Sequence, residues 1–74
     1  GYAAEAIALA TQYAFNGLDL NKLTAGMIID NVASHKAFIK AGYRDAGRLT
    51  RHVLYKGRYV DTVLVEKCRE VKDT

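Results

Sequence analysis

The sequence predicts a small α+β fold, with two helices and a mixed three-stranded sheet in the order helix, strand, helix, strand, strand. Three observations predict it. Apolar residues near the start recur at helical spacing, a short apolar run leads into a second, capped helical segment, and two strand-like runs flank a glycine turn. Because the chain has 74 residues, these elements can form no more than one small domain.

The first predicted helix runs from the start of the chain to Asn16-Gly17, a pair that is typical of a helix end. Its apolar residues fall in two neighbouring rows at helical spacing. Together these rows form a broad, alanine-rich face that we expect to pack on the sheet: Tyr2, Ala6, Leu9 and Tyr13, beside Ala3, Ile7, Ala10 and Ala14.

The segment around Asn31 carries the clearest local signals. Residues 23–29 are apolar enough for a buried strand, and Asp30-Asn31 then offers side-chain oxygens to the first turn of a helix over residues 32–41. Gly42 is expected where the chain must turn left-handed to leave this helix. Asn31 and Ser34 can simply cap the helix, which is the commoner arrangement. Alternatively, a polar side chain at a strand's end beside a helix N-terminus can hold a ligand with amides or phosphates.

Two strands over residues 48–55 and 59–65 are predicted to pair as an antiparallel hairpin around Lys56-Gly57-Arg58. Residues 44–47 read as a polar link before the hairpin, and residues 70–74 as a frayed tail. Strict alternation would place the residues of the first strand on two faces: Leu49, Arg51, Val53 and Tyr55 on one, Thr50, His52 and Leu54 on the other.

Charge and composition limit the partners and cofactors. The net charge is +3, but the basic residues are scattered and no aromatic platform accompanies them, so we expect no nucleic-acid binding. One cysteine and two histidines are too few for a metal centre or an internal disulfide. With no apolar run long enough to cross a bilayer, the cytoplasm is the expected location and a membrane partner is not expected.

The order of these signals resembles the C-terminal half of a GNAT-superfamily acyl-CoA N-acyltransferase, nearest to the ribosomal-protein, polyamine and amino-sugar acetyltransferases. The resemblance covers residues 1 to about 67. Gly1-Tyr2-Ala3 with Glu5-Ala6 is similar to the end of the family's pyrophosphate-binding loop and the helix behind it. The other matching positions are the strand over residues 23–28, the signature Asn31, Ser34 and Gly42-Tyr43, and the final hairpin with Gly47, Gly57 and Asp61.

The resemblance implies a function for this chain as part of a longer enzyme. It implies transfer of an acetyl group from acetyl-CoA to a primary amine by direct attack, with no metal. Cofactor-binding residues implied by the match are Gly1, Ala3, Asn31, Ser34 and Phe38. Many relatives carry a tyrosine at the place of Phe38, where it is thought to protonate the departing CoA thiolate. Phenylalanine has no proton to give, so packing on the sheet is the expected role of Phe38, and the catalytic residues stay unassigned.

Two further expectations follow from the resemblance. Residues 1–74 would be a single incomplete domain, because the family's fourth strand and most of its pyrophosphate loop have no counterpart here, so the piece alone should be inactive. An uncovered sheet edge would then favour self-association into a homo-oligomer. A non-catalytic, self-associating interaction module derived from the same fold is the alternative. The acceptor amine cannot be read from these residues.

Four polar side chains have a plain structural explanation beside a functional one. His35 is expected on the wetter side of its helix, as a surface histidine rather than a base. His52 could face a substrate from the middle of its strand. Asp61 is expected to pair with an arginine across the hairpin. Cys68 lacks the environment that would make it a nucleophile.

Overall fold

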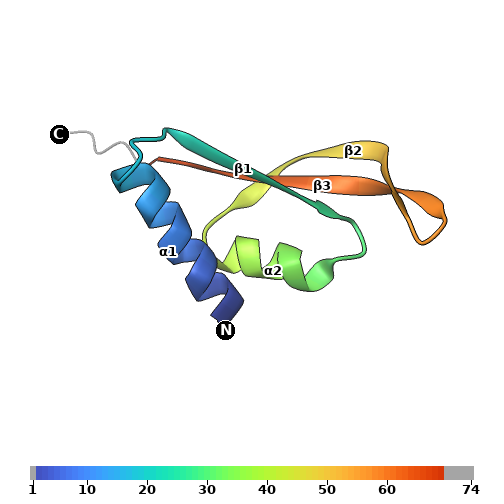
Figure 1. Cartoon of the computed structure of the whole chain (residues 1–74), viewed down its shortest axis with the longest axis horizontal. Helices are drawn as coiled ribbons and strands as arrows, with labels where there is room; N and C mark the ends of the chain where they lie inside the picture. The colour runs from blue at the N-terminus through green and yellow to red at the C-terminus, as the bar shows by residue number, and fades with distance from the viewer. Residues whose placement is uncertain (1, 70–74) are drawn as a thin grey trace.

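The computed structural model describes residues 2–69 and confirms the predicted order of elements (Figure 1). Two helices and three strands make an α+β fold: α1 (Tyr2–Asn16), β1 (Lys22–Ile28), α2 (Val32–Lys40), β2 (Arg44–Tyr55) and β3 (Arg58–Cys68). Residues 70–74, predicted as a tail, lie outside the described residues.

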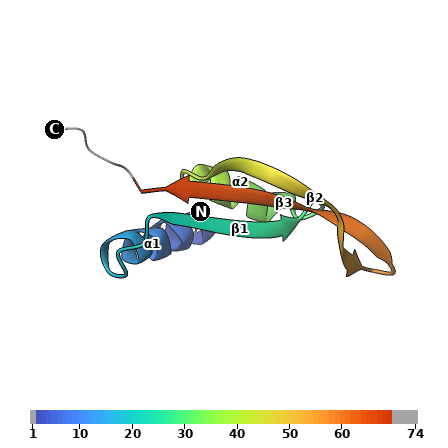
Figure 2. The same ribbon diagram turned by 90° about the horizontal axis from the view of Figure 1, so that it is seen from above.

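The three strands form one sheet in the order β1-β3-β2, and both pairs are antiparallel. The prediction of a mixed sheet was therefore wrong for the described residues. A mixed sheet needs at least one pair of neighbouring strands that run parallel. Here β3 lies between β1 and β2 and pairs antiparallel with each. Figure 2 shows β3 lying between the other two strands.

Both helices lie on one face of the sheet (Figure 1). The core between the two layers is small, with Met27, Tyr43 and Val65 at its centre. Val65 on the central strand is fully buried. Partly buried apolar side chains from both helices and two strands pack around this centre: Ile7, Leu23, Ala25, Phe38, Ala41 and Val63.

The face that α1 buries overlaps only in part with the predicted one. Tyr2 is 91% exposed, and Leu9 and Tyr13 are also exposed. Of the predicted residues, Ala14 is buried and Ile7 is half-buried, and the other buried residues are Ala4, Thr11 and Phe15. Small side chains, such as Ala4 and Ala8, lie where α1 meets the end of α2, and Phe15 lies beside the end of β3. Tyr2, Leu9 and Tyr13 are left uncovered within residues 2–69.

Both ends of α2 form as predicted, with the helix one residue shorter at its end. The Asn31 side chain accepts a hydrogen bond from the Ser34 N–H at 3.2 Å, which makes Asn31 the N-cap. At the other end the N–H groups of Gly42 and Tyr43 donate to Ile39 and Phe38, each at 3.0 Å. Gly42 has φ 100°, so this is the Schellman arrangement that favours glycine.

The hairpin is longer than predicted and contains a bulge. Residues 44–47, expected as a polar link, are part of β2, because they pair with the end of β3. Tyr55 pairs with Arg58, so Lys56 and Gly57 form a two-residue turn; both have positive φ, 51° and 82°, as in a type I′ turn. Between the pairs Leu49–Thr62 and Val53–Val60, residues 50–52 bulge opposite Asp61, which interrupts the predicted alternation.

Candidate functional site

Asn31 stands at the junction of the end of β1 and the start of α2. Its N–H donates to the Ile28 carbonyl at 2.9 Å, and its own carbonyl accepts from His35 at 3.2 Å. The capping bond uses the side-chain oxygen, so the exposed amide nitrogen keeps its two N–H donors for a ligand. The two interpretations of Asn31 are therefore compatible: one residue can cap α2 with its oxygen and offer N–H groups with its nitrogen.

Ser34 and Phe38 follow Asn31 along α2 at spacings of three and seven residues, so the three share one side of the helix. Ser34 and Phe38 are half-buried. The Phe38 ring packs edge-on against Tyr43, with ring centroids 5.0 Å apart and an interplanar angle of 81°. Phe38 thus packs α2 on the core while part of its ring faces outward.

Ala3 lies in the first turn of α1 and is exposed; Gly1 lies outside the described residues. The first half of α1 meets the C-terminal end of α2, where Ala4, Glu5 and Ala8 face Lys40 and Ala41 across a shallow cavity of about 290 Å³. Ala3 and Asn31 are therefore near opposite ends of α2, which is nine residues or about 13 Å long. Ala3, Phe38, Ser34 and Asn31 therefore follow one another in a line along α2, a spacing that suits an extended ligand.

A larger cavity of about 470 Å³ lies between the start of α2 and the sheet. Its walls are mostly apolar, with Met27, Ile28, Ile29, Val32 and Val63, while His35, Asp45, Gly47 and Arg48 supply its polar part. The Nε2 atom of His35 lies 2.6 Å from the Asp45 carboxylate. His35 is half-buried, less open than the surface position expected from the sequence. Sequence reasoning missed Asp45 because it assigned residues 44–47 to a link.

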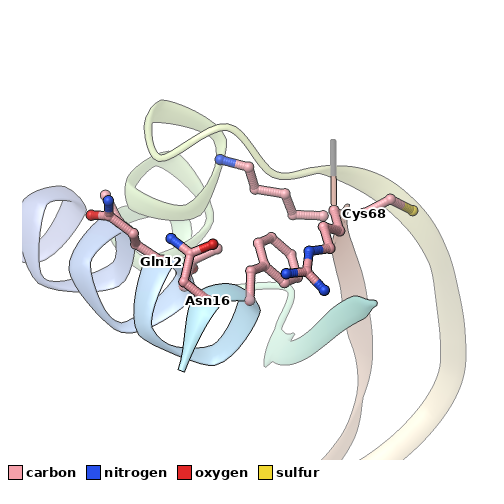
Figure 3. Close-up of a pocket in the computed structure, with 8 residues that line it drawn as sticks. Gln12, Asn16 and Cys68 are labelled. Carbon is pink, nitrogen blue, oxygen red and sulfur yellow. The ribbon is translucent and has the colours of Figure 1, made fainter. Parts of the chain in front are cut away.

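Figure 3 shows a third cavity, of about 340 Å³, between α1 and the end of β3. Gln12 and Asn16 reach it from α1, and Lys67, Cys68 and Arg69 line the opposite wall. The Cys68 sulfur points away from Gln12 and Asn16 in this view, and Cys68 is exposed. This cavity adds no reactive arrangement to the line along α2.

Asp61 pairs across the hairpin with an arginine, as predicted. Its carboxylate accepts from Arg48 Nε at 2.6 Å and from the Arg51 backbone N–H at 2.8 Å. The bond from the Arg51 N–H and then the Arg48 guanidinium hold the pKa of Asp61 below its usual value. Asp61 therefore fixes the bulge as an ionised carboxylate. His52 lies in that bulge, is exposed, and lines none of the three cavities described above.

The described residues offer little else on which a site could be built. Among residues 2–69 no three metal-binding side chains come together. Neither helix of the described part is long and apolar enough to cross a membrane.

Comparison with known proteins identifies the family of the chain. The model of the acetyltransferase (GNAT) domain matches residues 1–44. The uncharacterized N-acetyltransferase YoaA of Bacillus subtilis (strain 168) is 32% identical over 62 residues, which are 84% of this chain and 35% of that protein.

Solved structures agree with the family match. A variant of the spermidine N-acetyltransferase SpeG from Vibrio cholerae superposes with a TM-score of 0.87 at 25% identity, over 92% of this chain and 40% of that one. An acetyltransferase of the GNAT family from Bacillus anthracis shares the fold, with a TM-score of 0.84 at 24% identity over 92% of this chain and 41% of that one. The chain spans between a third and a half of the length of these proteins. By sequence and by fold, the chain belongs to the GNAT acetyltransferase domain family.

Proposed function

We propose that this chain is the C-terminal portion of an acetyl-CoA-dependent N-acetyltransferase and that it supplies part of the acetyl-CoA site. The observation that supports this most directly is Asn31, whose amide nitrogen stays available at the end of β1 while its oxygen caps α2. The pantetheine arm of acetyl-CoA carries two amides, which are the partners that an Asn side chain can recognise. Family membership supplies the reaction class.

The chain's own residues would bind and orient acetyl-CoA. The pyrophosphate would lie at the first turn of α1, beside Gly1 and Ala3, where free N–H groups and the helix dipole favour an anion. The pantetheine would run along α2 past Phe38 and Ser34 to Asn31. The spacing of these residues along the nine-residue α2 supports an extended pose of this kind.

The proposed chemistry is a direct transfer. Acetyl-CoA supplies an activated thioester, a neutral primary amine attacks its carbonyl carbon, the C–S bond breaks as the N–C bond forms, and the amine proton leaves to solvent or to the CoA sulfur. Phe38 carries no proton for that step. Tyr43, packed against it, is buried and its hydroxyl lies 2.7 Å from Thr11, which makes it a poor substitute. Neither Phe38 nor Tyr43 is therefore proposed as the general acid, and the general acid and base stay unassigned.

An assay of CoA thiol release by the whole protein tests this proposal. Incubated with acetyl-CoA and a panel of primary amines, the protein should release free CoA thiol only when an accepted amine is present. Mass spectrometry after incubation with acetyl-CoA alone should show no added acetyl group, because direct transfer has no acetylated enzyme. Amine-independent thiol release, or a covalent acetyl-enzyme, would contradict the direct mechanism. Residues 1–74 alone should release no CoA thiol. The alternative, a self-associating and non-catalytic module, gains no support from the comparisons, because the relatives are described as acetyltransferases.

SpeG of Vibrio cholerae is described as dodecameric. We propose that the protein containing this chain also forms a homo-oligomer, and that it works in the cytoplasm on a small-molecule or protein amine.

A further inference from the structure

The end of the β2–β3 hairpin carries several basic side chains and lies apart from the proposed acetyl-CoA site. The paired register of β1 with β3 ends at Ile28–Thr62, so within residues 2–69 the segment 53–60 is a two-stranded ribbon with no third strand beside it. This ribbon and the bulge before it, residues 50–60, are called the basic arm below. Figures 1 and 2 both show it extending past α2 and the end of β1.

The basic arm carries three cationic side chains and no carboxylate of its own, although Asp61 binds the Arg51 N–H beside it. Arg51, Lys56 and Arg58 are the cations, His52 lies next to Arg51, and the sequence from 46 to 60 contains no Asp or Glu. Arg58 lies 3.3 Å from Asp30, so it is partly neutralised. The sequence suggested scattered basic residues with no aromatic companions; the hairpin instead places a tyrosine beside two of them, Tyr59 on one face of the ribbon and Tyr55 on the other.

Each of the other two cations lies over a tyrosine ring. The Arg51 guanidinium carbon is 5.9 Å from the ring centroid of Tyr59, and Lys56 Nζ is 5.2 Å from that of Tyr55. Both distances are within the range of cation–π contact. Tyr59 nevertheless remains 57% exposed. Each pair presents a positive charge and an accessible aromatic face side by side.

The backbone of the arm is built to hold these side chains. Arg51 has φ 47° and Lys56 φ 51°, conformations that side-chain-bearing residues rarely adopt. Asp61 fixes the first through its 2.8 Å bond from the Arg51 N–H, and the type I′ turn fixes the second. Left-handed residues of this kind cost energy and persist only where the surrounding structure holds them, often at functional sites.

We infer that the basic arm binds single-stranded nucleic acid. A base would stack on Tyr59, and phosphates would contact Arg51 beside it and Lys56 at the turn, the combination of stacking and charge that sequence-tolerant single-strand binders use. An acidic protein segment would satisfy the charges but would make no use of the exposed aromatic faces. The inference is independent of acetyl transfer and stands or fails without it.

Fluorescence anisotropy with a labelled oligouridylate tests the inference on the full-length chain. Arg51→Asn with Lys56→Asn removes two charges while placing at both sites a residue that tolerates positive φ. Lys36→Gln with Lys40→Gln removes two charges from α2 and serves as the matched control. The arm variant should bind more weakly, and its plot of log affinity against log salt should be shallower by about 1.4, at about 0.7 for each lost phosphate contact.

Substitutions of Tyr59 distinguish the binding of nucleic acid from the binding of any polyanion. Tyr59→Leu should weaken oligouridylate binding about 5- to 150-fold, the range for one stacked base, whereas Tyr59→Phe should keep most of it. Circular dichroism checks that each variant folds. Any one of three results would overturn the inference. These are an equal loss of affinity in the arm and control variants, an unchanged affinity in Tyr59→Leu, and competition by polyglutamate as strong as competition by RNA.

Discussion

The phenolic hydroxyl of Tyr43 lies 2.7 Å from the hydroxyl oxygen of Thr11, and this buried contact joins α1 to the end of α2. Thr11 donates its own proton to the Ile7 carbonyl at 2.7 Å. Tyr43 is therefore the donor of the contact, and the Thr11 oxygen accepts. The pair holds the two helices in register around a core centred on Met27, Tyr43 and Val65.

Tyr43→Phe should lower the free energy of unfolding by about 0.5–1.5 kcal/mol, because it deletes one buried hydrogen bond and keeps the ring. The Thr11 proton keeps its partner at Ile7, so no donor is left unpaired. Urea denaturation measures the loss. A double-mutant cycle with Thr11→Val is the control. If the two substitutions change the free energy of unfolding additively, the contact between Tyr43 and Thr11 contributes nothing to stability.

Phe38→Ala should destabilise the fold by up to about 3 kcal/mol, the low end for a deleted phenylalanine, because Phe38 is only half-buried. Phe38→Tyr should fold normally, since its ring can keep the edge-on contact with Tyr43. In the whole protein this variant should leave the pH profile of turnover nearly unchanged. A new basic limb in that profile would show that a hydroxyl at this position can donate a proton.

Acid should destabilise the protein partly through Glu66. Lys22 Nζ lies 2.9 Å from its carboxylate and Arg44 Nη2 lies 2.8 Å from it, so one glutamate on the central strand links both neighbours. The hydrogen bond from Lys22 and then that from Arg44 hold the pKa of Glu66 below its usual value. A lowered folded-state pKa means a contribution that is fully present above the ordinary carboxylate pKa and lost as the pH falls through the folded value.

Glu66→Gln should therefore destabilise at neutral pH and become progressively less harmful as the pH falls below about 4.5. Urea midpoints of the variant and the unmodified chain, measured across this range, should converge at low pH. Glu5→Gln on α1 is the matched control. A Glu66→Gln deficit that stays constant with pH would mean that packing, and not charge, explains the loss.

The described part of the chain should associate in isolation. Tyr2, Leu9 and Tyr13 leave a large apolar surface on α1, and within residues 2–69 β1 pairs along one edge. Such surfaces favour contacts between copies. Sedimentation at several concentrations, together with intact mass, should show a dimer or a larger assembly of residues 1–74. A folded monomer whose mass does not change with concentration would contradict this expectation.

Local signals in the sequence predicted the elements well. Asn31 and Gly42 specify the ends of α2 through their own side-chain chemistry and backbone freedom, so neighbouring residues suffice to place them. The Lys56-Gly57 turn likewise depends on two adjacent residues. These features needed no knowledge of the tertiary structure.

The missed features depend on residues far apart in the sequence. The bulge at residues 50–52 exists because Asp61 on the opposite strand binds the Arg51 N–H. The buried face of α1 is set by Tyr43, which hydrogen-bonds Thr11 from 32 residues away. Alanines surround α1 on most sides, so hydrophobic spacing alone could not choose between faces. The pairing of His35 with Asp45 needed the start of β2 to be placed first.

Asn31 is proposed to hold acetyl-CoA with its amide nitrogen while its oxygen caps α2. Asn31→Asp separates the two roles, because aspartate caps equally well but has no N–H to donate. Asn31→Ala removes both, and should also lower stability by about 1 kcal/mol through the lost cap.

Calorimetric titration of the whole protein with acetyl-CoA decides the question. Asn31→Asp should keep the melting temperature and lose about 5- to 30-fold in affinity, as expected for one or two kcal/mol from an unpaired pantetheine amide. An unchanged affinity in Asn31→Asp, with a loss of stability confined to Asn31→Ala, would rule out a role in binding and leave Asn31 as a helix cap alone.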